Sequence, residues 1–248
     1  MCLIVVGWRA HPDYPLVVAA NRDEFFARPT AGAARWPDSP EVIGGLDLEA
    51  GGTWLGITDS GRFAAVTNVR EPGMDKGQNS RGDLTRRFLT GTTDAAEFAA
   101  TIDGDRYSGF NLLLSDGEAL YYASNRDGPP RPLAPGIYGL SNHLLDSPWP
   151  KLLKARKRFA NAIPALPDTS ALFELLADRE IVPDDALPST GVPLAWERLL
   201  SAIFVSSADY GTRASTVLWR HRCGKIHFTE KSFAAEGKLH SSVISTSE

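Results

Sequence analysis

The chain opens with the apolar stretch CLIVVGW, residues 2–8, and this stretch decides the fold class. Seven consecutive residues without a charge are typical of a β-strand that is covered on both faces. A turn that contains Pro12 and Pro15 separates it from a second apolar run at residues 16–20, and we expect the two strands to pair in antiparallel fashion. The sequence therefore predicts a layered protein in which the strand of residues 2–8 is central.

In the rest of the chain, turn residues and hydrophobic periodicity predict hairpins that are segregated from pairs of helices. Strands are expected at 53–58, 62–68, 110–114, 119–124, 137–141, 213–220 and 225–229, and helices at 80–90, 94–102, 150–163, 169–177 and 194–203. The Pro- and Gly-rich residues between 25 and 52 are expected to form a long loop. This order favours an α+β fold in a single domain of residues 1–248, with two antiparallel sheets covered by helices.

Composition narrows the possible partners. The 248 residues carry a net charge of −4 and are 43% hydrophobic, which argues for a globular protein and against nucleic acid or an anionic membrane as the main partner. We expect no transmembrane segment and no signal peptide, and hence a cytoplasmic location. A basic run at residues 151–158 is expected to form the solvated face of a helix, with Leu152 and Leu153 on the opposite face.

Motifs for common cofactors are missing from the sequence. It has no phosphate-binding Gly-Lys loop and no dinucleotide motif after a strand, and its five histidines show no zinc spacing. We therefore expect neither a metal nor a cofactor, and a small-molecule substrate or a hydrophobic ligand as the partner. The oligomeric state cannot be predicted from these patterns.

Cys2 is the first candidate for chemistry. If Met1 is removed, Cys2 carries a thiol and a free α-amine, whose ordinary pKa values of about 8.5 and about 7.7–8.0 allow the amine to take the thiol proton near neutral pH. This is the chemistry of an N-terminal-nucleophile amide hydrolase. The alternative is that Cys2 is simply a small apolar residue that begins a buried strand.

The polar cluster NRDE, residues 21–24, directly follows the second apolar strand. Two adjacent antiparallel strands would place Asp23 within reach of the amine of Cys2, where a carboxylate can hold an ammonium group. The same cluster could instead be a solvated strand end with a salt bridge from Arg22 to Glu24.

An ordered series of motifs along nearly the whole chain resembles the NRDE family, also called the transport and Golgi organisation protein 2 family. The motifs are the Met-Cys start, NRDE at 21–24, RP at 28–29, GGTWLG at 51–56, TNVRE at 67–71, YGLSN at 138–142, DSPW at 146–149 and YGTR at 210–213. Eukaryotic members of this family are associated with Golgi organisation, lipid metabolism and haem handling.

A more distant resemblance, to the choloylglycine hydrolases, implies a mechanism and a four-layer αββα sandwich of the N-terminal-nucleophile type. Carried over, Cys2 is the nucleophile, Asp23 orients its amine, Asn68 and Asn142 donate to the oxyanion or substrate carbonyl, and Arg213 stabilises the thiolate. Asn21, Arg22 and Trp54 are expected to contact the substrate. Taken singly, Asn68 and Asn142 could cap strand ends, Arg213 could form an ordinary salt bridge and Trp54 could simply pack beside a turn.

One position departs from the choloylglycine hydrolases. Those enzymes have an arginine immediately before the Asn-x-Asp motif, whereas this chain has Ala20. Strand alternation predicts that Arg22 points away from Asn21 and Asp23. The electrostatic surroundings of Cys2 therefore have to come from elsewhere in the structure.

Two functions follow from these observations. The first is an amidohydrolase that cleaves a non-peptide carbon–nitrogen bond through a thioester on Cys2, with the five carried-over residues at the mouth of one pocket and a thiol pKa lowered by Arg213 and the α-amine. The second is a non-catalytic carrier or chaperone of a hydrophobic ligand, an acyl chain or haem. The carrier requires an apolar cleft, for which Trp36, Trp54 and Trp149 are the candidate lining residues.

Overall fold

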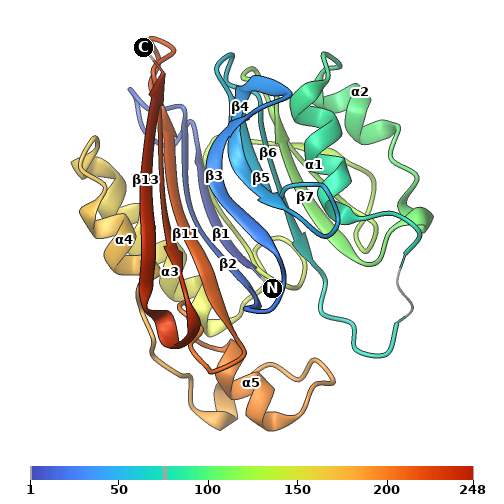
Figure 1. The fold of residues 1–248 in the computed structure, drawn as a ribbon, viewed down its shortest axis with the longest axis vertical. Helices are drawn as coiled ribbons and strands as arrows, with labels where there is room; N and C mark the ends of the chain where they lie inside the picture. Colours follow the sequence, from blue (N-terminus) through green and yellow to red (C-terminus); the bar gives the residue numbers. More distant parts are fainter. Residues whose placement is uncertain (1, 75–76, 248) are drawn as a thin grey trace.

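The computed structural model describes residues 2–74 and 77–247, and it consists of two antiparallel sheets that lie face to face with helices on both outer sides (Figure 1). Met1, whose removal the hydrolase hypothesis requires, lies outside the described residues. The first sheet has the order β10-β1-β2-β11-β12-β13. Its strands are β1 (Cys2–Trp8), β2 (Leu16–Phe25), β10 (Gly136–Leu140), β11 (Tyr210–Arg220), β12 (Ile226–Phe233) and β13 (Leu239–Ser247).

The second sheet has the order β3-β4-β5-β6-β7-β8-β9. Its strands are β3 (Thr30–Trp36), β4 (Ser39–Asp47), β5 (Leu55–Thr58), β6 (Phe63–Asn68), β7 (Phe110–Ser115), β8 (Leu120–Ser124) and β9 (Arg131–Leu133). The helices are α1 (Arg81–Thr90), α2 (Ala95–Ala100), α3 (Pro150–Ala162), α4 (Ser170–Leu176) and α5 (Leu194–Leu200), with short 3-10 turns η1 (Gly104–Arg106), η2 (Ile163–Ala165), η3 (Asp184–Ala186) and η4 (Ala235–Gly237).

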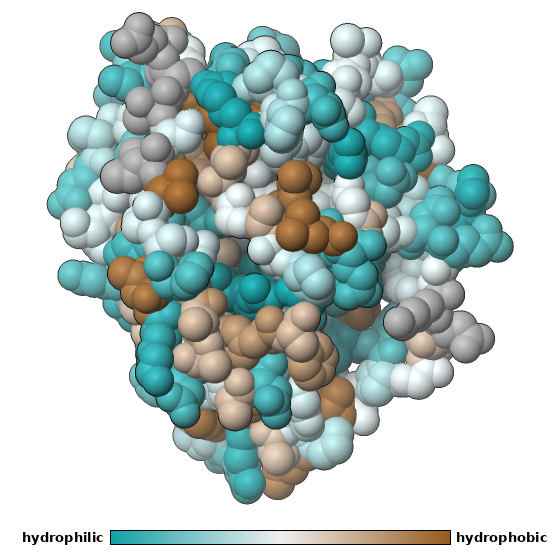
Figure 2. All heavy atoms as spheres, viewed as in Figure 1, coloured by the Kyte–Doolittle hydropathy of each residue, from teal (hydrophilic) through white to brown (hydrophobic). Residues whose placement is uncertain are grey.

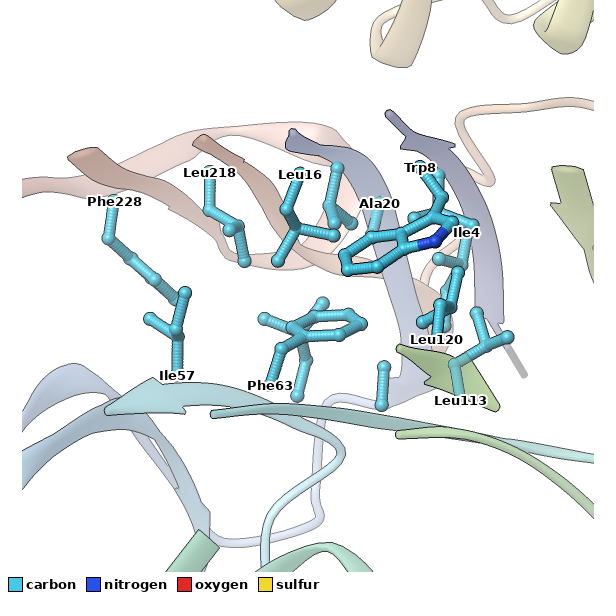
Figure 3. Packing of buried hydrophobic residues seen from close by; sticks show 14 of the residues in the cluster. Ile4, Trp8, Leu16, Ala20, Ile57, Phe63, Leu113, Leu120, Leu218 and Phe228 are labelled. Carbon is cyan, nitrogen blue, oxygen red and sulfur yellow. The ribbon is translucent and has the colours of Figure 1, made fainter. Parts of the chain in front are cut away.

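The strand β1 explains why four layers form. Its residues Ile4, Val6 and Trp8 point into the core between the two sheets, where they meet apolar side chains of the second sheet (Figure 3). Leu3 and Val5 point to the opposite face and pack against α3 and α4. Both faces of the strand are therefore buried, as the unbroken apolar run predicts.

The other outer layer is formed by α1 and α2 on the second sheet. Leu84 and Phe88 of α1 and Phe98 of α2 pack against Ala64 and Leu112 of that sheet. With α3 and α4 on the first sheet, the layer order is αββα, and the predicted α+β fold class is confirmed.

The expected long loop between residues 25 and 52 is wrong, because β3 and β4 form a hairpin there. The glycines of this segment suggested a loop, yet Gly44 lies inside β4, where an added Cβ would come within 2.7 Å of the Leu55 carbonyl oxygen. Glycine is needed at this position for a close approach of two backbones rather than for a turn. The strands β9 and β13 were also not expected, since their sequences lack a clear alternation of apolar and polar residues.

The longest helix, α3, has 13 residues. No helix within residues 2–74 and 77–247 has the length and apolar character that crossing a membrane requires.

Candidate functional site

A cleft of about 570 Å³ opens between the two sheets at the end of the molecule where β1 begins. Four of the predicted site residues line it: Cys2, Asp23, Asn68 and Arg213. Arg22 and Trp54, two of the three expected substrate contacts, line it as well. A hollow with hydrophilic residues in its floor is visible near the middle of this face in Figure 2.

The register of β1 and β2 places Arg22 beside Cys2. The two residues are direct partners across the strands, so their side chains share the face that looks toward the second sheet. Alternation does turn Arg22 away from Asn21, as expected, but the face to which it turns is the one that Cys2 occupies. A cation thus lies next to the thiol although residue 20 is an alanine.

The thiol of Cys2 is nevertheless not acidic. Burial raises the pKa of Cys2, and the charge of Asp23 raises it further, while the Arg22 charge and a hydrogen bond from the backbone of Asp23 lower it. The net effect in the chain that keeps Met1 is a raised pKa. The lowered pKa expected from the sequence concerns Cys2 as the N-terminal residue, and it stays a prediction. A nucleophilic Cys2 therefore needs a base that removes its proton.

Arg22 also belongs to an ion-pair group at the rim of the cleft. Its guanidinium lies 3.9 Å from a Glu24 carboxylate oxygen and 3.7 Å from one of Asp47. Arg28 donates to the same Asp47 carboxylate at 2.8 Å. The salt bridge between Arg22 and Glu24, which the sequence offered as the alternative to a site role of this cluster, is present, and Arg22 also lines the cleft.

Asp23 is buried and held by the neighbouring strand. The hydroxyl of Thr212 donates to its carboxylate at 2.7 Å and accepts from the backbone amide of Val205 at 2.9 Å. Burial raises the pKa of Asp23, whereas the nearby positive charge of Lys151 lowers it. The orientation of this carboxylate is thus fixed by Thr212 of the YGTR motif, in which only Arg213 was expected at the site.

Asn68 and Asn142 differ in their positions. The side chain of Asn68 lines the cleft, and within the described residues no hydrogen bond engages its amide. Asn142 is fully buried and does not line the cleft; its Nδ2 donates to the Asn68 carbonyl oxygen at 3.2 Å. Next to it, the Ser141 hydroxyl donates to the Cys2 carbonyl oxygen at 3.2 Å. Asn142 and Ser141 therefore support the strand ends that carry Asn68 and Cys2.

Arg213 lies where β11 bulges, between its pairings through Thr212 and Ala214. Its Nη1 donates to the carbonyl oxygens of Phe25, Phe26 and Arg28 at 3.1, 3.3 and 2.6 Å. The side chain thus ties the chain after β2 to β11 while it lines the cleft.

Asn21, the third expected substrate contact, faces the helices instead of the cleft. Its Nδ2 donates to the carbonyl oxygens of Leu176 and Ile203, each at 2.9 Å, and its Oδ1 accepts from Ser215 at 2.6 Å. All of these groups are on the helix side of the first sheet, so Asn21 holds the two layers together.

Only one of the three tryptophans considered for an apolar cleft lies there. Trp54 lines the cleft, but Trp36 is buried under α1 and Trp149 lies at the start of α3, where the Arg70 guanidinium stacks on its ring. The expectation is therefore wrong for Trp36 and Trp149. Instead, the cleft is lined by charged side chains from strands of both sheets, from loops and from α1, namely Arg22, Glu24, Arg28, Asp47, Glu49, Arg81, Arg213 and Glu230.

Lys151 is a buried charge behind the site that the sequence interpretation missed. It was assigned to the solvated face of its helix, yet it is 5% exposed, while Leu153 is 51% exposed. The signal was present, because Lys151 shares the helix face of Ala155 and Phe159 at spacings of four residues. Its ammonium donates to the Leu200 carbonyl oxygen at 2.8 Å, and burial lowers its pKa to about 8.

This buried lysine predicts a pH dependence of stability. Between the folded pKa of about 8 and the ordinary value of 10.5, the unfolded chain holds a proton that the folded chain lacks, so stability rises with pH in this window and is flat below it. The unfolding free energy of the wild type should gain up to about 3 kcal/mol over that of Lys151→Met from pH 8 to 10.5. Urea titrations measure this difference. Lys157 lies on the exposed side of the same helix. The difference in unfolding free energy between wild type and Lys157→Met should therefore stay constant over this pH range.

In the part of the chain that the structure describes, no three His, Cys, Asp or Glu side chains are grouped so that they could hold a metal ion. The site consists instead of a thiol, a buried carboxylate, an amide and arginines.

The family profile described as Transport and Golgi organisation 2 matches residues 1–235. The chain belongs to this family. Among its relatives, the Transport and Golgi organization protein 2 homolog of Bos taurus is 38% identical, over 94% of this chain and 93% of its own. The Drosophila melanogaster Transport and Golgi organization protein 2 is 30% identical, over 94% and 92%.

The fold of this family member is also similar to that of a solved hydrolase. The Caenorhabditis elegans ortholog of N-acylethanolamine-hydrolyzing acid amidase matches with a TM-score of 0.53 and 13% sequence identity, over 88% of this chain and 92% of its own. At this identity the likeness concerns the fold, an αββα arrangement of the N-terminal-nucleophile hydrolase type.

Proposed function

We propose that the protein is a hydrolase of a non-peptide amide bond, with Cys2 as its N-terminal nucleophile and a thioester as the intermediate. The observation that carries this proposal is the position of Cys2. Its side chain faces a polar cleft at the first position of a buried strand, with Arg22 directly opposite and the backbone of Asp23 hydrogen-bonded to the thiol. A purely structural cysteine has no need of such surroundings.

Removal of Met1 supplies the base that the thiol lacks. Because burial keeps the thiol protonated, a neighbouring group has to accept its proton, and the α-amine of an exposed Cys2 terminus has a suitable ordinary pKa of about 7.7–8.0. In this proposal the buried Asp23 carboxylate orients the amine, and its hydrogen bond from Thr212 supports a fixed orientation of the carboxylate.

The reaction proceeds in two steps. The α-amine takes the thiol proton, the sulfur attacks the amide carbon, and the C–N bond breaks while the α-ammonium returns the proton to the leaving amine. Water then adds to the thioester, the C–S bond breaks, and a carboxylic acid leaves as the thiol is restored. Asn68 donates to the oxyanion of each tetrahedral intermediate, with Asn142 fixing its backbone from behind.

The remaining cleft residues bind and orient the substrate in this proposal. Arg22 favours the thiolate through its charge, Arg213 holds the cleft wall together and adds positive charge, and Trp54 offers an apolar surface for part of the substrate. Both cysteines are free thiols in the structure. A reduced Cys2 suits the proposed cytoplasmic location.

Asn68 provides a test of the oxyanion assignment. Asn68→Ala should lower kcat by about 10²- to 10³-fold with little change in KM, because its amide acts in the transition state. Steady-state kinetics on an acyl amide measure both constants. Asn79→Ala removes the same amide elsewhere in the cleft and should change kcat much less. Equal losses in the two variants would argue against the assignment.

The proposal as a whole is tested by the state of the N-terminus. Intact mass separates protein with and without Met1, and the Met1-free form should hydrolyse members of a panel of acyl amides and alkylate rapidly with iodoacetamide near neutral pH. The Met1-retaining form should do neither. If the Met1-free thiol reacts as slowly as a free cysteine and no amide is cleaved, the non-catalytic carrier is the better description.

A further inference from the structure

Arg81 is a cleft arginine whose surroundings differ from those of Arg22 and Arg28. It is the first residue of α1, lines the cleft and is half-buried, and its Nη1 donates to the Gly109 carbonyl oxygen at 3.2 Å. Within residues 2–74 and 77–247 no carboxylate oxygen lies within 4 Å of its guanidinium. Arg22 and Arg28, in contrast, both lie within 4 Å of Glu24 and Asp47.

The carboxylates of the cleft already have partners. Arg28 binds Asp47 at 2.8 Å and Glu49 at 3.2 Å. Thr212 donates to Asp23, and the two oxygens of Glu230 accept from the Ala33 amide at 2.7 Å and from the Thr216 hydroxyl at 3.1 Å. Among residues 2–74 and 77–247, the fold therefore provides acids for two arginines of the cleft, Arg22 and Arg28, and none within 4 Å of Arg81.

A half-buried guanidinium without a counterion is unfavourable. Burial lowers the pKa of Arg81, yet an arginine stays cationic in a protein, so the cost of desolvation is not relieved by loss of a proton. Arg213 also lacks a carboxylate within 4 Å in the described chain, but three backbone carbonyls accept from its Nη1. Arg81 has one such carbonyl and is the cation of the cleft best able to accept a ligand.

Arg81 lines the same cleft as Cys2, the proposed nucleophile, and as Glu24. A group bound by Arg81 would be part of the same molecule whose amide carbon meets the sulfur.

We infer that Arg81 binds an anionic group of the substrate, and that the substrate is therefore an amide that carries a carboxylate or a similar oxyanion. This inference rests on the proposed function for the reaction, but the binding of an anion at Arg81 can be measured without turnover. A planar guanidinium with free N–H donors suits a carboxylate in particular.

The experiment uses Cys2→Ser protein, in which no thiolate exists and no thioester forms, and isothermal titration calorimetry with three probes. N-octanoylglycine carries its carboxylate on the amine half, N-octylsuccinamic acid carries it on the acyl half, and N-octanoylethanolamine is neutral. Arg81→Gln and Arg81→Lys are compared with Arg87→Gln, which removes the same charge from an exposed position of the same helix, where Arg87 lies 3.9 Å from Asp83.

At least one of the two acids should bind about 10- to 100-fold more tightly than the neutral amide, and Arg81→Gln should abolish this preference. Arg81→Lys should keep part of it and Arg87→Gln all of it, while binding of the neutral amide stays constant. The acid that is preferred identifies the half of the substrate that carries the anion. Equal affinities of acids and neutral amide, no binding of either acid, or equal effects of Arg81→Gln and Arg87→Gln would overturn the inference.

The outcome is separable from that of the proposed function. Anion binding that depends on Arg81, without hydrolysis of any probe by Met1-free wild type, would leave the inference standing and refute the hydrolase. Hydrolysis of the neutral probe alone would support the hydrolase and refute the inference about Arg81. If Arg81→Gln fails to fold, two other measurements replace it. Arg81→Lys should lose part of the preference for the acids, and sodium chloride should weaken binding of the acids but not of the neutral amide.

Discussion

Cys2→Ser should reduce amide turnover by the Met1-free protein by about 10⁴-fold or more, since the covalent intermediate forms on the sulfur and every other cleft residue acts on that intermediate. A serine hydroxyl holds its proton far more strongly than a thiol, so the α-amine cannot prepare it in the same way. Single-turnover measurements with a chromogenic acyl amide, together with intact mass to detect the acyl-enzyme, follow this loss directly.

Cys223→Ser is the matched control, because Cys223 is the second free cysteine and is exposed outside the cleft. It should keep full turnover and the acylated mass on Cys2. Retention of turnover in Cys2→Ser, or its loss in Cys223→Ser, would contradict the assignment of the nucleophile. Equal melting temperatures of both variants would show that the loss is chemical rather than structural.

Glu197→Gln should destabilise the protein by about 3–5 kcal/mol, because it leaves the charge of Arg70 buried without its carboxylate. The two side chains, each 5% exposed, meet at 2.8 Å behind the site, and the other Glu197 oxygen accepts from the amide of Thr190 at 2.7 Å. This pair joins α5 to the chain that follows β6. Urea unfolding at neutral pH measures the free-energy difference.

The neighbouring pair Arg198–Asp184 provides the comparison. Arg198 lies on the same helix and Asp184 at the start of η3, but the two side chains are 47% and 53% exposed, so Asp184→Asn should cost less than about 1 kcal/mol. Similar losses in the two variants would mean that burial does not set the cost of breaking the Arg70–Glu197 pair.

The two-sheet, helix-covered fold could be predicted from residues 2–8 and from the hairpins and helix pairs that follow, since unbroken apolar runs and turn residues are local signals. The hairpin of β3 and β4 could not be predicted in this way. Glycine is needed at position 44 because the backbone of β5, a later strand, approaches it closely. The end of β2 was likewise placed too early: residues 21–25 are polar or aromatic, and their pairing with β11, together with that of Asn21 and Arg22 with β1, keeps them in a strand.

Within the site, the resemblance to the choloylglycine hydrolases led us to expect Cys2, Asp23, Asn68 and Arg213 at one cleft, and all four line it. The direction in which each of these side chains points could not be predicted from the motifs. Asn21 faces the helices, Asn142 lies behind Asn68, and the relation of Arg22 to Cys2 depends on a register that composition does not encode.

That register has a consequence for how the site is built. Every residue of β1 is buried, and apolar residues occupy both of its faces, so hydrophobic pattern alone does not distinguish the observed register from one shifted by one position. Such a shift would turn Cys2 toward α3 and away from Arg22. Two features near the other end of β1, some six residues or about 20 Å from the sulfur, favour the observed register. They are the length of the turn between Trp8 and Leu16 and the place of Gly7, where an added Cβ would come within 3.1 Å of Phe159. The hairpin turn thus acts on the cleft from a distance. A residue inserted or deleted there would favour the shifted register, in which the Cys2 thiol no longer faces Arg22.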